Sequence, residues 1–197
     1  MSYHVYTTES FILKGRPLRE ADAYYQILTR DLGLITASAQ GVRRLESKLS
    51  PALVDGSQTT LSLVRGKHAW RIIGAVTIQN TAREFIGKKS QRVIWFRFLN
   101  TVRLMIGGEE KNSKVFELTN LFKSALLQRD FSFQELQALE RLGIFFLMYE
   151  LGYAHFRREY ESFFYTDMFS DNAIEQALLQ KEIITLDINR ALAASQS

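Results

Sequence analysis

The hydrophobic periodicity of the chain changes after Asn80, and this change limits the folds that the chain can adopt. From Val5 to Gln79 apolar residues alternate with polar ones, which is the two-residue period of half-buried strands. Beyond Asn80 apolar residues recur every three or four positions, as they do along one face of a helix. The 197 residues therefore predict an α+β protein, with a domain of strands over residues 1–80 and an α-helical domain over residues 81–197.

Five segments before Asn80 have strand-like alternation, at residues 5–13, 22–30, 34–39, 58–65 and 69–78. In the fourth segment, Leu61 and Leu63 are expected on the face opposite Thr60, Ser62 and Val64. Asp31-Leu32-Gly33 and Gly66-Lys67 are typical of tight turns between strands. Five short strands in so few residues favour a small closed or partly open barrel, because closure removes exposed strand edges.

Helices are expected at residues 90–106, 114–128, 133–151, 172–181 and 188–194. Ser132 and Glu135 have the spacing of a capping box at the start of the third helix, and Asp187 is the expected N-cap of the last one. The apolar positions of the first helix predict a buried face made of Val93, Phe96, Leu99 or Val102, and Ile106.

Composition excludes several classes of protein. The chain has no cysteine, so it holds neither a disulfide framework nor a thiolate zinc site. Its N-terminus does not resemble a signal peptide, and no apolar run approaches the roughly 18 residues that span a bilayer. It carries neither a phosphate-binding glycine-rich loop nor a nucleophile elbow, and its three histidines are not paired. We expect a cytoplasmic protein that is not an enzyme and that uses no metal or other cofactor.

Charge is unevenly distributed along the chain. Residues 1–80 hold ten Lys and Arg against six Asp and Glu, and residues 81–130 hold ten against five. Residues 131–197 reverse the balance, with five against ten. The first two-thirds of the chain is therefore expected to attract a polyanion such as nucleic acid, which the last third would repel.

Two basic surfaces are candidate nucleic-acid sites, because guanidinium and ammonium groups bind phosphate oxygens. One surface is the segment from Gly41 to Lys48, which follows the third strand, together with bases of the first connection; its residues are Arg43, Arg44, Lys48, Lys14, Arg16 and Arg19. The other surface is helical and has Glu84 as its one opposing acid; its residues are Arg83, Lys88, Lys89, Arg92, Arg97 and Arg103. A solvated helix face is the alternative interpretation of the second surface.

Aromatic side chains in the strands are a third candidate element. Tyr24, Tyr25 or Trp70 could stack on nucleic-acid bases, as aromatic residues do in single-strand-binding barrels. Burial in the barrel core is the alternative for each of the three.

Several short motifs in the first part of the chain occur in the order and spacing of one known family. They are Tyr6-Thr7-Thr8-Glu9-Ser10-Phe11-Ile12-Leu13-Lys14, Arg19-Glu20-Ala21-Asp22, Leu28-Thr29-Arg30-Asp31-Leu32-Gly33 and Gly41-Val42-Arg43-Arg44. Together with the turn at residues 64–67, they resemble the N-terminal domain of RecO, the bacterial DNA repair and recombination mediator. Residues 145–153 more loosely resemble a segment of that family that ends in Leu-Gly-Tyr.

The resemblance implies an OB-fold barrel followed by an α-helical domain. It implies a non-enzymatic protein of DNA repair and homologous recombination that binds single- and double-stranded DNA, anneals complementary strands and helps to load RecA. The implied partners are DNA, a RecR-like mediator and single-strand-binding protein, and the implied location is the nucleoid in the cytoplasm. By motif, DNA binding falls on Arg43 and Arg44 and, less closely, on Lys48, whereas Lys88, Lys89 and Arg92 are candidates from charge alone.

Two departures from the family pattern concern the end of the chain. Many members carry a four-cysteine zinc module after the Leu-Gly-Tyr segment, but residues 154–159 contain no cysteine. The chain also stops about 45 residues after Tyr153. The resemblance therefore predicts a shortened, zinc-free member, and leaves open whether it docks single-strand-binding protein or a RecR-like mediator.

Two other functions fit the same sequence. A protein-interaction adaptor would use the barrel and the acidic last third for protein partners, and an RNA-binding barrel would prefer RNA to DNA. The adaptor is favoured by nine aromatic residues within 21 positions, which exceed what one helix normally buries: Phe145, Phe146, Tyr149, Tyr153, Phe156, Tyr160, Phe163, Phe164 and Tyr165.

Overall fold

The structure is a computed structural model and describes residues 4–67, 69–155, 157, 160 and 167–195. The chain divides into two compact units, which are described separately. The barrel unit comprises Met1–Ile86 and Ile106–Phe116, and the helical unit comprises Gly87–Met105 and Glu117–Ser197. The domain boundary between residues 80 and 81 stays a prediction.

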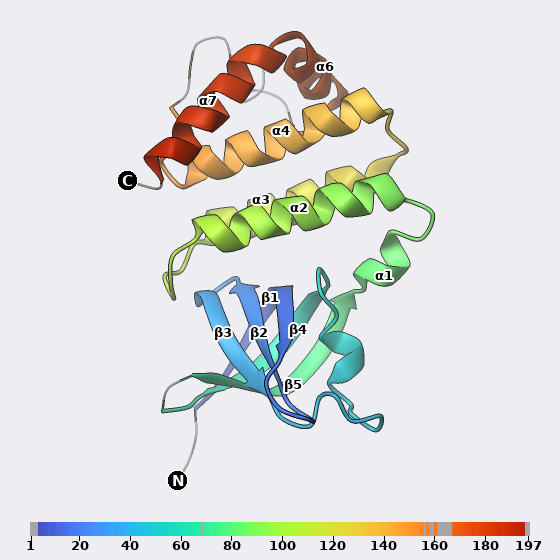
Figure 1. Cartoon of the computed structure of the whole chain (residues 1–197), viewed down its shortest axis with the longest axis vertical. Helices are drawn as coiled ribbons and strands as arrows, with labels where there is room; N and C mark the ends of the chain where they lie inside the picture. The colour runs from blue at the N-terminus through green and yellow to red at the C-terminus, as the bar shows by residue number, and fades with distance from the viewer. Residues whose placement is uncertain (1–3, 68, 156, 158–159, 161–166, 196–197) are drawn as a thin grey trace. The chain divides into compact units, whose positions relative to one another are not determined.

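Five strands form the barrel: β1 (Val5–Pro17), β2 (Ala23–Thr29), β3 (Gly33–Ala39), β4 (Gln58–Arg65) and β5 (Trp70–Gln79). Their order around the closed barrel is β1-β2-β3-β5-β4 (Figure 1). β3 and β5 are parallel, and all other neighbours are antiparallel. This is the five-stranded arrangement of an OB-fold, so the predicted fold class is confirmed.

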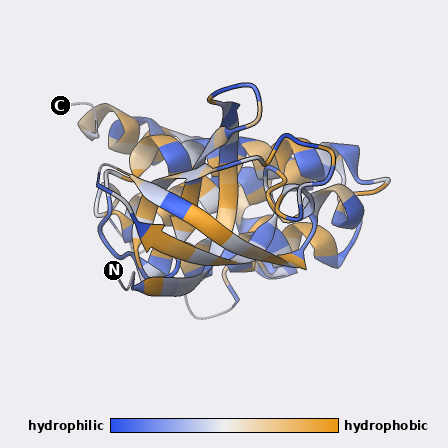
Figure 2. Cartoon of the chain, turned by 90° about the horizontal axis from the view of Figure 1, so that it is seen from below, coloured by the Kyte–Doolittle hydropathy of each residue, from blue (hydrophilic) through white to orange (hydrophobic). Residues whose placement is uncertain are grey.

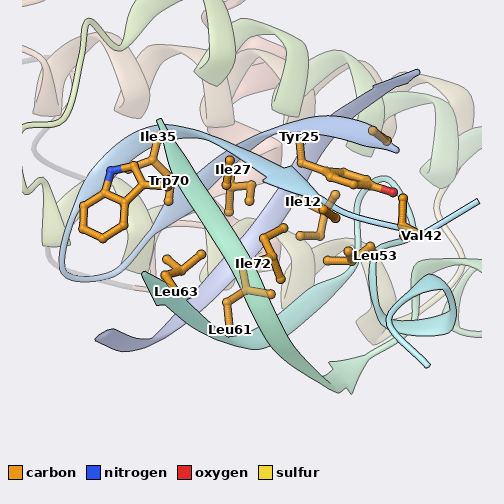
Figure 3. Packing of buried hydrophobic residues seen from close by; sticks show 13 residues of the cluster. Ile12, Tyr25, Ile27, Ile35, Val42, Leu53, Leu61, Leu63, Trp70 and Ile72 are labelled. Carbon is orange, nitrogen blue, oxygen red and sulfur yellow. The ribbon is translucent and has the colours of Figure 1, made fainter. Parts of the chain in front are cut away.

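Alternation along the strands places one set of apolar side chains inside the barrel. Leu61 and Leu63 of β4 are fully buried, whereas Thr60 and Ser62, which alternate with them, are half-buried. Figure 3 shows the inward side chains from all five strands meeting in one cluster, which Val42 and Leu53 of the β3–β4 connection complete. Figure 2 shows hydrophobic and hydrophilic stretches following one another along the strands of the barrel.

The β2–β3 turn depends on a glycine. Gly33 has a φ of +72°, a left-handed conformation that other residues rarely adopt. A Cβ added there would lie 2.2 Å from the carbonyl oxygen of Glu110, so a larger residue has no room. The same segment is held to the turn by an ion pair between Lys111 Nζ and Asp31 Oδ1 at 3.2 Å. A hydrogen bond from Thr8, helped by Lys111, lowers the pKa of Asp31 below its usual range.

A short helix follows the barrel strands, and the other helices lie largely in the helical unit. The bounds are α1 (Thr81–Glu84), α2 (Lys89–Met105), α3 (Ser113–Gln128), α4 (Phe133–Glu150), α6 (Asp171–Leu179) and α7 (Lys181–Ala194). Within the helical unit, α4 packs against α2 on one side and against α6 and α7 on the other (Figure 1). Gly143 of α4 allows close packing, because a Cβ there would lie 2.6 Å from the Phe122 ring of α3.

The predicted buried face of α2 is wrong at two of its positions. Val93 is 44% exposed and Phe96 is 36% exposed. The face that packs inward consists of Ile94, Trp95, Phe98, Leu99 and Val102. Apolar residues occur on more than one side of this helix, so periodicity alone does not identify the buried side. Neighbouring helices decide it: the Phe98 ring lies 4.3 Å from that of Phe122.

The capping box at the start of α4 is confirmed. Ser132 Oγ accepts the Glu135 N–H at 3.3 Å, and Glu135 Oε2 accepts the Ser132 N–H at 2.7 Å. Arg129 joins this cap to α6, since its Nη2 lies 2.8 Å from Glu135 Oε1 and 2.7 Å from Asp171 Oδ1. These hydrogen bonds, with that of Arg129 the strongest, lower the pKa of Glu135 from 4.5 to about 2.

The predicted N-cap role of Asp187 is wrong, because α7 begins six residues earlier, at Lys181. Asp187 is buried within the helix, where its carboxylate accepts hydrogen bonds from Arg157 Nη2 at 2.6 Å and from the Tyr160 hydroxyl at 2.7 Å. The carboxylate thus ties Arg157 and Tyr160 to α7. Its partners are distant in sequence, so local spacing gave no sign of this role.

Most of the clustered aromatic residues that the structure describes are core. Phe145, Phe146 and Tyr160 are buried, Tyr149 is half-buried, and Tyr153 is 37% exposed. The sequence predicted that some of these rings are exposed, and among the described residues Tyr153 is the one that is. Four others lie outside the described residues: Phe156, Phe163, Phe164 and Tyr165.

Candidate nucleic-acid interface

A row of outward-facing side chains crosses four strands of the barrel. Arg16 of β1 stands opposite Tyr24 of β2, Tyr24 opposite Ser38 of β3, and Ser38 opposite Arg71 of β5. Directly opposite residues point to the same face of a sheet, and neighbouring strands are about 4.8 Å apart. We call Arg16, Tyr24, Ser38 and Arg71 the cross-strand row. It places an exposed ring and a hydroxyl between two arginines whose backbones are about 15 Å apart.

A second row lies beside the first on the same face. Lys14 of β1 stands opposite Gln26 of β2, and Gln26 stands opposite Thr36 of β3. Lys14 and Thr36 are exposed and Gln26 is half-buried. The face therefore offers cations on its β1 side and hydrogen-bonding groups across its middle. Such groups match a phosphate backbone and base edges, respectively.

The structure separates the three aromatic candidates. Tyr24 is 37% exposed, whereas Tyr25 and Trp70 are 8% and 5% exposed and belong to the barrel core (Figure 3). Burial, helped by the nearby Asp55 carboxylate, raises the pKa of Tyr25 above its ordinary value of 10.0. Tyr24 is thus the candidate among these three whose ring a base can reach.

The segment Gly41–Lys48, which we call the basic loop, is attached to the connection between β1 and β2. The Gly41 N–H donates to Asp22 Oδ1 at 2.8 Å, and the Arg43 N–H donates to the Ala21 carbonyl at 3.0 Å. The Arg43 guanidinium also donates to the Arg19 carbonyl at 2.9 Å. These contacts hold the loop beside the start of β2, next to Tyr24 in the chain.

The predicted bases of the barrel unit are available to solvent. Arg43, Arg44 and Lys48 of the basic loop are exposed, and so are Arg16 and Lys14. Lys14 has a carboxylate neighbour, because its Nζ lies 3.5 Å from Asp55 Oδ2. The loop and the β1 side of the strand face are joined through the connection at Arg19–Asp22, so these cations belong to one region of the barrel unit.

Arg71 completes the cross-strand row but was not among the predicted site residues. A signal for it was present in the sequence, since it lies between the apolar residues Trp70 and Ile72 of a strand and must face outward. Its place beside Ser38 was not predictable, because the parallel pairing of β3 with β5 brings together residues 33 positions apart.

The helical candidates differ from one another in their surroundings. Lys89 and Arg92 are exposed on α2. Lys88 is half-buried and its ammonium donates to the Leu127 carbonyl at 2.9 Å, while the Gln91 side chain donates to the Arg129 carbonyl at 3.2 Å. Helix C-terminal carbonyls need such donors, so Lys88 has a structural role at the end of α3.

The larger set of helical bases does not form one unopposed patch. Arg97 Nη1 lies 3.5 Å from Glu140 Oε2, an acid that α4 supplies and that local sequence did not indicate. The Arg103 guanidinium donates to Asn100 Oδ1 at 2.8 Å. Arg83 belongs to the barrel unit, and the others belong to the helical unit. Lys89 and Arg92 are the exposed remainder of this set on α2.

Two further observations concern the part of the chain that the structure describes. There, no three His, Cys, Asp or Glu side chains are grouped so that they could bind a metal ion. None of the helices there has the length and apolar character of a membrane span.

Comparison with known proteins finds a family match over the strands of the barrel. Residues 1–81 match the family model described as "Recombination protein O N terminal". The first 81 residues are similar to the N-terminal domain of RecO. The resemblance seen in the motifs of the strands is thereby confirmed, and the OB-fold topology agrees with it.

Curated proteins that resemble this chain carry the name "DNA repair protein RecO". That of Dehalococcoides mccartyi (strain CBDB1) is 40% identical over 77 residues, which cover 39% of this chain and 30% of the relative. That of Synechococcus sp. (strain JA-2-3B'a(2-13)) is 28% identical over 163 residues, 78% of this chain and 56% of the relative. The chain thus spans about a third to just over half of the length of these relatives.

Proposed function

We propose that this protein binds single-stranded DNA through the face of its OB-fold barrel and acts in DNA repair and recombination. The cross-strand row carries the proposal, because it combines an exposed aromatic ring with cations on both sides. Base stacking on a ring and neutralisation of phosphates are the two main contributions to the affinity of sequence-independent single-strand binding. The names of the relatives support the repair role.

The dimensions of the row suggest how much DNA the face would hold. Its two arginines are about 15 Å apart at the backbone, which is the length of two to three extended nucleotides. In this arrangement Tyr24 stacks on a base, while Arg16 and Arg71 each bind a phosphate. Arg43, Arg44 and Lys48 of the basic loop, with Lys14, continue the contact along the strand. Affinity then comes mainly from the release of condensed counterions and falls with salt.

Strand annealing and contact with double-stranded DNA would use the same surfaces. A protein that neutralises two strands at once lowers their mutual repulsion, which would favour annealing and contact with double-stranded DNA. Lys88, Lys89 and Arg92 would add a second cationic site, to which Lys89 and Arg92 contribute most because Lys88 is engaged at the end of α3. A RecR-like mediator, single-strand-binding protein and, indirectly, RecA are the partners proposed from the family. Binding and annealing need no catalytic group, so the proposed activity is non-enzymatic. Binding to chromosomal DNA would place the protein at the nucleoid.

The test is binding of a fluorescent single-stranded oligonucleotide across a salt series. With about five phosphates engaged, log K is expected to fall against log salt with a slope near −3.5. The Arg43→Ala/Arg44→Ala double variant should weaken binding and lower the magnitude of this slope by about 1.4. Lys181→Ala/Arg190→Ala removes two exposed charges from α7 and is the matched control. Equal affinity of the Arg43→Ala/Arg44→Ala variant and the wild type at about 0.1 M salt would refute the proposal.

One observation favours a second candidate function, that of a protein-interaction adaptor. A groove of the helical unit between α2 and α4 is lined by the apolar residues Val93, Phe133 and Leu136 and also by Lys89, Arg97 and Glu140. Phe133 is 75% exposed and Val93 is 44% exposed. Val93→Glu/Phe133→Glu should abolish capture of purified RecR-like or single-strand-binding protein and leave the barrel's DNA affinity unchanged. Unchanged capture would remove the groove from the adaptor hypothesis.

A further inference from the structure

Asp22 differs from the other carboxylates in or near the basic loop, Glu20 and Glu46, because it accepts a backbone hydrogen bond from the loop itself. Its carboxylate accepts the N–H of Gly41, the first residue of the basic loop, at 2.8 Å. Arg19 precedes it on the same connection, and Arg43 bonds to that connection through both its backbone and its guanidinium. A carboxylate here opposes phosphate binding by simple electrostatics, so its presence calls for a compensating role.

The conformation of the basic loop depends on Gly41. This glycine has a φ of +63° and its carbonyl accepts the Arg44 N–H at 3.1 Å, which closes the turn that carries both arginines. Three hydrogen bonds hold the turn to residues 19–22, and Asp22 makes the one that comes from a side chain on that connection. The Asp22 carbonyl meanwhile accepts the Leu18 N–H at 3.0 Å, so its own loop is closed by its backbone.

The rest of the loop is anchored independently of this carboxylate. Val42 is 3% exposed and belongs to the barrel core, and Leu53 anchors the far end of the connection. Loss of the Asp22 carboxylate therefore leaves the barrel folded. Its loss removes the hydrogen bond that fixes Gly41, at the start of the turn that carries the arginine pair.

We propose that Asp22 is a positioning residue of the DNA-binding site: it contacts no DNA, and it holds the turn at Gly41 so that Arg43 and Arg44 face the strand. This inference rests on the proposed function for its effect on DNA. The proposal predicts that loss of the Asp22 carboxylate as a hydrogen-bond acceptor weakens DNA binding. Charge alone predicts the opposite, since removing a carboxylate from a cationic surface should strengthen phosphate binding.

Two substitutions separate the alternatives. Asp22→Ala removes both the charge and the acceptor of the Gly41 N–H. Asp22→Asn removes the charge and keeps an amide oxygen that can accept the same N–H. At about 0.1 M salt each lost phosphate contact weakens single-strand binding about fivefold, so Asp22→Ala should weaken it by about five- to 25-fold. Asp22→Asn should bind as tightly as the wild type or more tightly.

A second measurement tests the hydrogen bond without DNA. Exchange of the Gly41 amide hydrogen should be faster in Asp22→Ala than in the wild type and little changed in Asp22→Asn, while amides of β2 and β3 stay protected in all three. Asp22→Ala that binds DNA as tightly as the wild type, or more tightly, overturns the proposal. Wild-type protein that binds no single-stranded DNA would instead refute the proposed function, and the exchange experiment would still decide whether Asp22 holds the loop.

Discussion

Oδ2 of Asp55 lies 3.5 Å from the ammonium of Lys14, at the β1 side of the proposed DNA-binding face. The other carboxylate oxygen accepts the Gly15 N–H at 2.8 Å, so Asp55 braces β1 while it competes for a cation of the site. The two side chains are 54% and 34% exposed, for Lys14 and Asp55 respectively. A phosphate would have to replace this carboxylate as the partner of Lys14.

Asp55→Asn should therefore strengthen binding to single-stranded DNA. The amide oxygen can still accept the Gly15 N–H, while Lys14 is freed for one more phosphate contact. We expect an increase in affinity of about fivefold at about 0.1 M salt, with a slope steeper by about 0.7. Asp130→Asn removes the same charge from an exposed site of the helical unit and should change neither value. Anisotropy titrations would measure both; an unchanged slope for Asp55→Asn would contradict the prediction.

Substitution of the adjacent tyrosines should separate binding from stability. Tyr24→Ala removes an exposed ring, so we expect a loss of about 1–3 kcal/mol in single-strand binding, an unchanged salt slope and little change in unfolding free energy. Tyr25→Ala empties part of the barrel core and should destabilise the unit by about 3–5 kcal/mol. Oligonucleotide titration and urea unfolding of the two variants make the comparison. Equal effects of both variants on DNA affinity would argue against Tyr24 as the stacking residue.

Two neighbouring lysines at the start of α2, Lys88 and Lys89, should also differ in their effect on stability. Lys88→Met removes the donor to the Leu127 carbonyl, so we expect the free energy of unfolding to fall by about 1 kcal/mol. Lys89→Met changes an exposed side chain and should stay within about 0.5 kcal/mol of the wild type. Denaturant unfolding of both variants tests this. If Lys88→Met were as stable as Lys89→Met, the hydrogen bond to α3 would have no energetic role.

Glu135 should make the stability of the protein depend on pH in the acid range. Its pKa falls from 4.5 to about 2 in the folded protein, so the carboxylate form is bound more tightly by the native state. The resulting stabilisation is complete above about pH 4.5 and is lost as the pH falls towards 2. Glu135→Gln should lower the free energy of unfolding by about 1 kcal/mol at neutral pH.

This difference between Glu135→Gln and the wild type should shrink on acidification and vanish near pH 2, which urea unfolding at a series of pH values would measure. A difference that stayed constant from neutral pH to about pH 2.5 would show that the charge of Glu135 does not stabilise the fold. Ser132→Ala offers an internal comparison, because it removes the hydroxyl acceptor of the same capping box without removing the carboxylate.

Local features of the sequence sufficed to predict most helices and strands and the type of fold. The bounds of β4 were predicted as they are observed, because alternation of Leu61 and Leu63 with polar residues has one interpretation in a short strand. The capping box at Ser132 and Glu135 marked the start of α4, since both hydrogen bonds are made within four residues. Hydrophobic periodicity, turn residues and helix caps each depend on residues close together in the sequence, so they can be recognised without knowledge of the fold.

Tertiary structure decided which side chains face one another. Alternation implies that Tyr24 and Tyr25 point in opposite directions, but only closure of the barrel shows which one is outside. The buried side of α2 was settled by α3 and α4, and the role of Asp187 was settled by Arg157 and Tyr160. The cross-strand row from Arg16 to Arg71 is likewise absent from any local pattern. Strand pairing joins residues 55 positions apart, and such contacts exist only once the chain has closed.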